Sequence, residues 1–233
     1  MIELAALVDI IHFVEAGAID EHAEVDIALI EGSVTTADEQ QRIQSIRHRS
    51  KYLISIGACA TSGGIQALRN INDSEAWVKA IYPKREWVEA LTTATPMKAH
   101  VRIDYELWGC PISTQQIMRV LHNLIQGIEP IDEQDSVCLA CKRDGNACLV
   151  VTKGEPCMGP VTRTGCNAIC PKFGRACYAC YGPKENANAP ALVKVFQSQG
   201  LSDKQIQQRF QFINNAAPEF QAHDTTHNDG DKP

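Results

Sequence analysis

The sequence of 233 residues lacks three features that would each place it in a large class of proteins. It has no apolar run of the ~18 residues needed to cross a membrane, so no membrane insertion is expected. It has no excess of basic residues: 22 Lys and Arg stand against 28 Asp and Glu, and the net charge of −6 argues against a nucleic-acid partner. The apolar opening at residues 4–14 has no basic leader, so it is not expected to be a signal peptide.

Cysteine, by contrast, is abundant and concentrated. Eight of the ten cysteines lie in residues 138–180, here called the cysteine-rich window, with the spacing C-x2-C-x6-C-x8-C-x8-C-x3-C-x6-C-x2-C. Eight thiols divide naturally into two sets of four, which suits two metal centres. The eight residues are Cys138, Cys141, Cys148, Cys157, Cys166, Cys170, Cys177 and Cys180.

Three interpretations of this window compete. Disulfide frameworks of this density are typical of short secreted chains, which this chain does not resemble. Zinc would use the two C-x2-C pairs, but it leaves four cysteines unexplained, and the window contains no histidine. Iron–sulfur clusters take four thiolates each and tolerate mixed spacings, including a Cys-Pro ending such as Cys170-Pro171. We favour two four-iron clusters, which would be assembled in a reducing cytoplasm.

The first half of the chain has the pattern of a parallel α/β sheet. Apolar runs at residues 25–30 and 52–56 predict buried strands, and the polar stretch 36–50 between them predicts a helix. The second strand leads into a Gly-rich loop, 57–64, which lacks the lysine and spacing of a phosphate-binding loop. A third strand is expected at 101–105.

Two cysteines follow predicted strands. Cys59 lies in the Gly-rich loop, and Cys110 lies between a glycine and a proline after the third strand. Ligands of such sheets bind beyond the carboxyl ends of the strands, although a lone cysteine there is more often an inert buried thiol. Ser113 with Gln116 predicts a capping box at the start of a helix that ends near residue 127. Further helices are expected at residues 2–14, from 65 onward, and at 75–81, 87–91, 192–196 and 203–213.

Five segments in order carry a family resemblance: Glu31–Thr36, Gly57–Ala60, Trp108–Pro111, Lys153–Arg163 and the run Cys166–Cys180. Together they resemble the small subunit of soluble cytoplasmic nickel–iron hydrogenases, the sulfhydrogenase delta and NADP-linked type, within the NADH:ubiquinone oxidoreductase 20 kDa-like family. The resemblance implies a flavodoxin-like parallel-sheet domain followed by a ferredoxin-like iron–sulfur domain. The implied divisions are 1–130 for the first domain, 131–185 for the second, 186–215 for C-terminal helices and 216–233 for a disordered tail.

The resemblance also implies which cysteines bind which cluster. In the family a proximal four-iron cluster faces the large subunit, and Cys59 and Cys110 match two of its ligand motifs. By chain order, the window would hold a distal and a medial 4Fe-4S cluster. The distal ligands would be Cys138, Cys141, Cys148 and Cys157, and the medial ligands Cys166, Cys170, Cys177 and Cys180.

The implied function is electron transfer within a hydrogenase, with no catalysis by this chain alone. Electrons would pass between the nickel–iron large subunit and a diaphorase partner that carries FAD, NAD(P) and iron–sulfur groups. The alternatives are a component of a coenzyme F420-reducing or complex I-like oxidoreductase, and a zinc-bearing scaffold protein. The family's Cys-x-Gly-Cys pair is absent before the first expected helix, so the proximal site is incomplete. We expect a start codon assigned too late rather than a degenerate subunit.

Overall fold

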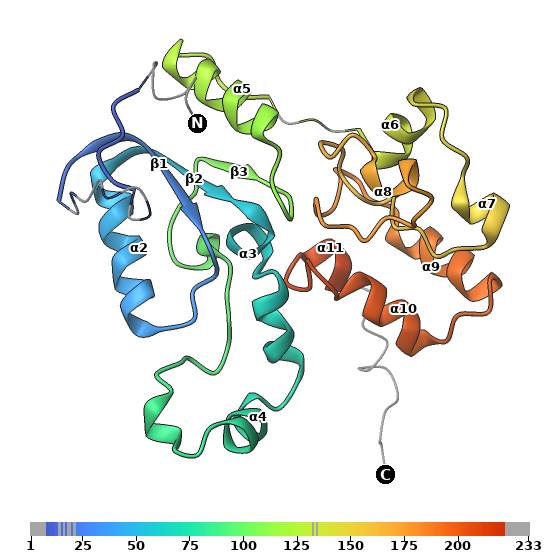
Figure 1. The fold of residues 1–233 in the computed structure, drawn as a ribbon, viewed down its shortest axis with the longest axis horizontal. Helices are drawn as coiled ribbons and strands as arrows, with labels where there is room; N and C mark the ends of the chain where they lie inside the picture. The colour runs from blue at the N-terminus through green and yellow to red at the C-terminus, as the bar shows by residue number, and fades with distance from the viewer. Residues whose placement is uncertain are drawn as a thin grey trace.

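A computed structural model describes residues 8–13, 15, 17, 20, 22–131, 133 and 135–221. The chain forms two parts that lie side by side (Figure 1). The first contains a small parallel sheet with helices around it, and the second consists of short helices and loops around the cysteine-rich window.

The first part confirms the expected mixed α/β class. Its three strands pair in the order β1-β2-β3, and both pairings are parallel, as in a flavodoxin-like domain. Ile27 pairs with Tyr52 across the first pairing, and Ile54 pairs with Tyr105 across the second. The third strand begins later and is shorter than the sequence predicted. The strands are β1 (Val25–Glu31), β2 (Ser50–Ile56) and β3 (Tyr105–Leu107).

One helix covers each face of this sheet. The helix α2 (Ala37–Arg49) packs Ile43 against Leu53 of β2, and its N-terminus is capped by Thr36. On the other face, α5 (Thr114–Ile125) packs against Ile54 of β2. The predicted capping box of α5 is wrong, because the side chain of its N-cap residue makes no capping hydrogen bond. Alternate residues of β2 therefore face opposite layers, as the two-residue period of a strand requires.

The segment between β2 and β3 departs most from expectation. The predicted Gly-rich loop begins as a helix, and the predicted helix after it has 3₁₀ geometry. The helix expected at 87–91 is also wrong, because helical structure ends at Trp87. The elements here are α3 (Gly57–Ser62), η2 (Ile65–Ile71), α4 (Ser74–Ile81), η3 (Arg85–Trp87) and η4 (Met97–Ala99).

The helix expected at residues 2–14 is not formed at residues 8–13, which are described and non-helical. Residues 1–7 and 14 lie outside the described residues, so the rest of that prediction is not addressed.

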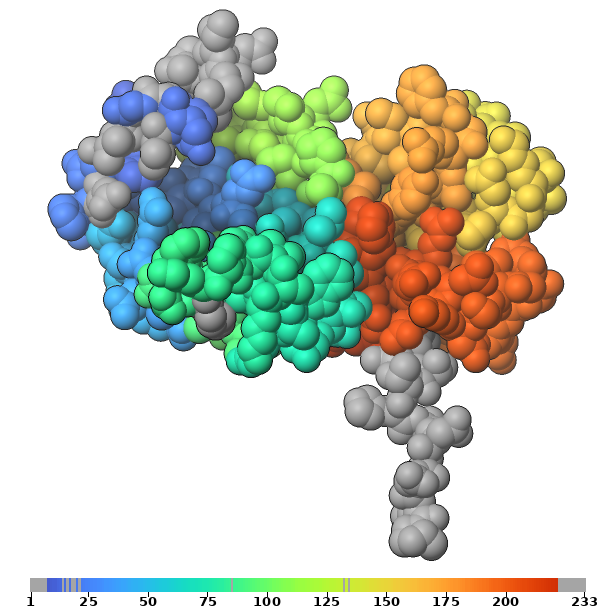
Figure 2. All heavy atoms as spheres, turned by 60° about the horizontal axis from the view of Figure 1, so that its bottom comes forward, coloured from blue at the N-terminus to red at the C-terminus, as the bar shows by residue number. Residues whose placement is uncertain are grey.

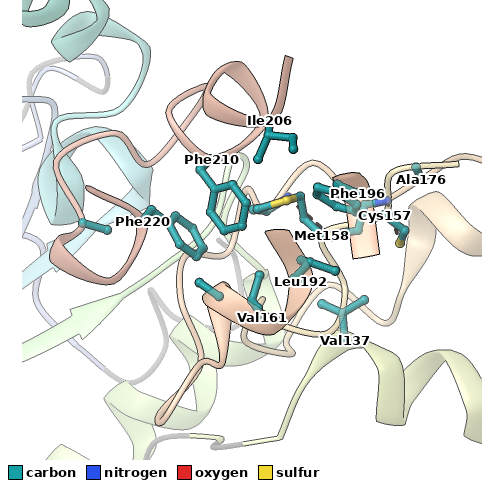
Figure 3. Close-up of a cluster of buried hydrophobic side chains, with 14 of the residues drawn as sticks. Val137, Cys157, Met158, Val161, Ala176, Leu192, Phe196, Ile206, Phe210 and Phe220 are labelled. Carbon is teal, nitrogen blue, oxygen red and sulfur yellow. Dashed lines mark hydrogen bonds between the residues drawn. The ribbon is translucent and has the colours of Figure 1, made fainter. Parts of the chain in front are cut away.

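The second part has a core of its own. Met158, Phe196, Phe210 and Phe220 are each at most 1% exposed and pack together (Figure 3). Within the described residues from 135 onward, β pairing is limited to isolated bridges such as that between Ser136 and Arg163. The helices are α6 (Val137–Arg143), α7 (Leu149–Lys153), α8 (Ile169–Lys172), α9 (Ala189–Ser198), α10 (Asp203–Phe210) and α11 (Pro218–Gln221).

The prediction that the tail begins at residue 216 is wrong for its first six residues. Pro218–Gln221 forms α11, and Phe220 packs edge-on against Phe210 with ring centroids 5.6 Å apart. Figure 2 shows the segment around α11 lying against the first part of the chain. Residues 222–233 of the predicted tail lie outside the described residues.

Trp108 joins the two parts. It follows β3, yet its side chain is buried in the core of the second part, where it lies against Gly182. The Tyr181 hydroxyl donates a hydrogen bond to the carbonyl of Pro111 over 3.2 Å. Among the described helices, none has both the length and the apolar character that crossing a membrane requires.

Candidate iron–sulfur site

Cys59 lies in the first turn of α3, directly beyond the carboxyl end of β2. Gly64 closes over its sulfur: a Cβ at Gly64 would lie only 2.5 Å from Cys59 Sγ. Burial raises the pKa of the Cys59 thiol, the neighbouring Cys110 raises it further, and the N–H groups of Ile65 and Gln66 act in the opposite direction. Two backbone donors therefore point at this sulfur, which suits a thiolate that is shared with a metal group.

Cys110 reaches the same edge of the sheet from β3. The N–H of Ala58 donates to the carbonyl of Gly109 over 2.9 Å, so the two cysteine loops are held together. Cys110 is solvent-exposed and precedes a cis proline, Pro111. The structure thus brings the two thiols together at the carboxyl edge; that they bind a cluster stays a prediction.

The first four thiols of the window also form one group. Cys138 and Cys141 lie on α6, and Cys148 is the N-cap residue of α7. Burial raises the pKa of Cys138 to about 11, with further contributions from the neighbouring thiols of Cys157, Cys141 and Cys148. Four thiols that influence one another electrostatically must lie close together.

Two of these sulfurs face a residue that has no side chain. The residue that faces them is Gly159, and a Cβ there would lie 3.3 Å from Cys138 Sγ and 3.5 Å from Cys157 Sγ. Its backbone does not have the left-handed φ that would by itself require glycine. Any side chain at this position would crowd a group held between the two sulfurs.

The last four thiols lie in α8 and in the loops on either side of it. Burial raises the pKa of Cys180 to about 12, and the thiols of Cys166, Cys170 and Cys110 raise it further, while the Cys110 N–H lowers it. Burial and Cys166 likewise raise the pKa of Cys170. This second set therefore lies next to the loop of Cys110 in the first part of the chain.

Cys177 adjoins both sets. Its N–H donates to Cys157 Sγ over 3.2 Å, and its own sulfur accepts from the N–H of Ala179 over 3.4 Å. Its sulfur also lies 3.8 Å from Thr162 Oγ1. Cys157 and Cys177 are therefore the residues at which the two sets of thiols meet.

The donor set fits iron–sulfur chemistry. All ten cysteines are free thiols, and several sulfurs face backbone N–H groups, the donors that thiolate-bound clusters receive. Within the described part of the chain, no three His, Cys, Asp or Glu side chains converge closely enough to hold a single metal ion. Because bound metals need thiolates, the raised thiol pKa values mean that loading must release protons.

Sequence reasoning missed the polar residues that support these loops. Asn214 and Asn215 are 1% and 4% exposed and donate hydrogen bonds to the loops that carry Cys177 and Cys59. Two adjacent asparagines after a short helix give no local signal of this role.

Comparison with known proteins shows the family of the chain. Residues 1–124 match the model of the NADH ubiquinone oxidoreductase, 20 Kd subunit family. The chain belongs to this family, as its motifs suggested. Among curated relatives, it is 33% identical over 206 residues to sulfhydrogenase 2 subunit delta of Pyrococcus furiosus, covering 88% of this chain and 86% of that one.

Other relatives are hydrogenase components too. The chain is 29% identical to a component of the F420-non-reducing hydrogenase of Methanococcus voltae, over 80% of this chain and 77% of the relative. It is also 32% identical to a chain in the structure of an NAD⁺-reducing [NiFe]-hydrogenase, with a TM-score of 0.44, over 47% of this chain and 68% of that one.

Proposed function

We propose that this chain is the iron–sulfur electron-transfer small subunit of a nickel–iron hydrogenase. It would relay electrons between the hydrogen site of a large subunit and a diaphorase partner with FAD, NAD(P) and iron–sulfur groups. The observation that carries the proposal is the grouping of ten free thiols at three adjoining places, in a chain whose relatives are hydrogenase components.

The thiol groups would hold three iron–sulfur groups in a row. The set of Cys138 would hold the distal 4Fe-4S cluster, and the set of Cys180 the medial one, within a ferredoxin-like domain. Cys59 and Cys110 would supply two ligands of the proximal cluster. The order is supported by the electrostatic effect of Cys110 on Cys180, because a thiol assigned to the proximal cluster then adjoins one assigned to the medial cluster.

The chain's own residues would bind, orient and shield these groups. When bound, thiolate-ligated clusters supply one-electron exchange. Backbone N–H groups such as those of Cys177 and Ala179 donate to sulfur and so stabilise added negative charge. The apolar core behind the window, including Met158 and Phe196, excludes water from the inner side of the clusters.

Exposed apolar side chains in the segment that follows Cys59 suit docking of the large subunit. Directly after α3, the side chains of Ile65, Trp77, Ile81 and Trp87 are 51–64% exposed. Large obligate interfaces are rich in such residues. We therefore propose that the segment from η2 to η3 contributes to the interface with the large subunit.

A cytoplasmic location is part of the proposal. Ten free thiols and no disulfide in the described residues suit a reducing compartment.

One second candidate is favoured by a specific observation. The chain is 26% identical over 151 residues to the gamma subunit of a coenzyme F420 hydrogenase of Methanococcus voltae, covering 54% of this chain and 57% of that one. The same relay could therefore end on an F420-reducing partner instead of an NAD(P)-linked one. The identity of the proteins that co-purify with the chain would decide between them.

The central test is metal content. The full chain, loaded with iron and sulfide without air, should show broad absorbance near ~400 nm and about eight irons bound by the window. A Cys141→Ser change should remove about four of these irons, while Thr152→Ser on neighbouring α7 should remove none. Zinc in place of iron would overturn the proposal and favour a scaffold protein.

A further inference from the structure

Asn214 connects the two parts of the chain through its buried side-chain amide. Ser62, at the end of α3, donates its hydroxyl to Asn214 Oδ1 over 2.6 Å. On the other side, Asn214 Nδ2 donates to the carbonyl of Ala179 over 2.5 Å. Ser62 is fully buried and Asn214 is 1% exposed, so no water competes for these bonds. One amide therefore bridges the helix of Cys59 and the loop between Cys177 and Cys180.

Ala179 is a residue whose conformation needs support. It adopts a left-handed backbone with φ of 61°, which disfavours any residue with a Cβ. In this conformation its N–H points at Cys177 Sγ over 3.4 Å, and its carbonyl accepts from both Asn214 Nδ2 and the N–H of Gly182. Losing the amide would leave a buried carbonyl with one donor fewer and would free the residue to relax.

The neighbouring residues hold the amide in place. Asn215 donates its side-chain amide to the carbonyl of Gly64, which closes over Cys59. Ala217 and Phe220, which follow, are each 1% exposed and belong to the second core, so the short segment is anchored to both parts of the chain. Asn214 is thus fixed before any group binds.

We propose that Asn214 is a positioning residue that sets the reduction potential of the group held by the set of Cys177 and Cys180. It acts by holding Ala179 in the left-handed conformation, so that the Ala179 N–H stays on the Cys177 sulfur. When the group gains one electron from its neighbour, which is oxidised by one electron, this N–H stabilises the added negative charge. The inference rests on the proposed function, because it requires a redox group at that place.

The test is an EPR-monitored redox titration of the full chain in its complex. Asn214→Leu keeps a similar volume and removes both hydrogen bonds. The expected result is a more negative midpoint potential for one of the two groups of the window, with the other unchanged and the iron content equal to that of the parent.

Two further variants separate this role from general packing. Ser62→Ala removes the hydrogen bond to Asn214 Oδ1 and leaves the bond from Asn214 Nδ2 to the Ala179 carbonyl, so it should leave the potential unchanged. Asn70→Leu is a matched control, because the amide of Asn70 braces the backbone of Ala94 in the same way, far along the chain from the window. It too should change no potential.

Each outcome decides the question. Unchanged potentials in Asn214→Leu, with full iron, overturn the inference. Loss of iron from the set of Cys180 alone also overturns it, because Asn214 would then be needed to hold the group and not to set its potential. Loss of iron from both sets marks Asn214 as a general packing residue and overturns it. A parent chain that binds no iron instead overturns the proposed function, and this is known before any variant is made.

Discussion

Gly159 offers the sharpest test of whether Cys138 and Cys157 face a common group. Replacing it with alanine adds one methyl group 3.3 Å and 3.5 Å from the two sulfurs. These distances require a shift of only a few tenths of an ångström in the protein without metal. Gly→Ala also lowers the conformational entropy of the unfolded chain, which stabilises the folded state by about 0.4–1 kcal/mol. The free energy of unfolding should therefore stay within about 1 kcal/mol of the parent.

The effect on a bound group should be much larger. A cluster between the two sulfurs must occupy the side that the new methyl group would enter, so Gly159→Ala should lose about four irons of about eight per chain. Urea denaturation of the metal-free chain and iron analysis of the anaerobically loaded chain measure the two effects separately.

Gly154→Ala is the matched control. Gly154 ends α7 with a left-handed φ of +64° and has open space around it. Alanine there should cost about 1–2 kcal/mol of stability and no iron. We expect Gly154→Ala to lose stability but keep its iron, and Gly159→Ala to lose iron but keep its stability. Full iron in Gly159→Ala would refute the idea that this glycine leaves room for a cluster.

Two more predictions concern stability. Phe220→Ala should lower the free energy of unfolding in urea by about 3–5 kcal/mol, whereas Phe212→Ala, 44% exposed, should cost much less; equal losses would contradict the packing of α11. Burial would raise the pKa of Asp104, but hydrogen bonds from Arg47 and the Leu53 N–H leave it below 3.8. Its stabilisation is therefore present above pH 3.8 and lost as pH falls through the folded pKa, and Asp104→Asn should flatten that acid limb of a stability–pH curve.

The sheet could be predicted from sequence where local pattern and burial agree. β1 and β2 are apolar runs bounded by polar or glycine residues, and the structure places them within two residues of the predicted ends. β3 was placed too early because Tyr105–Leu107 pairs over only three residues, and that pairing is set by contact with β2. Nothing in its own residues distinguishes it from residues 101–104 before it, which have an equally strand-like alternation.

The supporting residues of the candidate site could not be predicted for a related reason. The cysteines were visible through their spacing, but the polar segment from residue 216 reads as a tail, with Phe220 as its one large apolar residue. Phe220 is buried only because Phe210 and the second core lie beside it. Whether such residues are buried depends on contacts between segments distant in sequence, and these contacts cannot be seen in a single sequence.

The contacts between the two parts of the chain concentrate near the thiols. The Tyr181 hydroxyl reaches Pro111 from the residue after Cys180, and Asn215 reaches Gly64, which closes over Cys59. Such contacts fix the relative positions of neighbouring cysteine loops. A relay of one-electron carriers would need such fixed separations between its groups. These contacts are therefore what the proposed electron transfer requires of the chain.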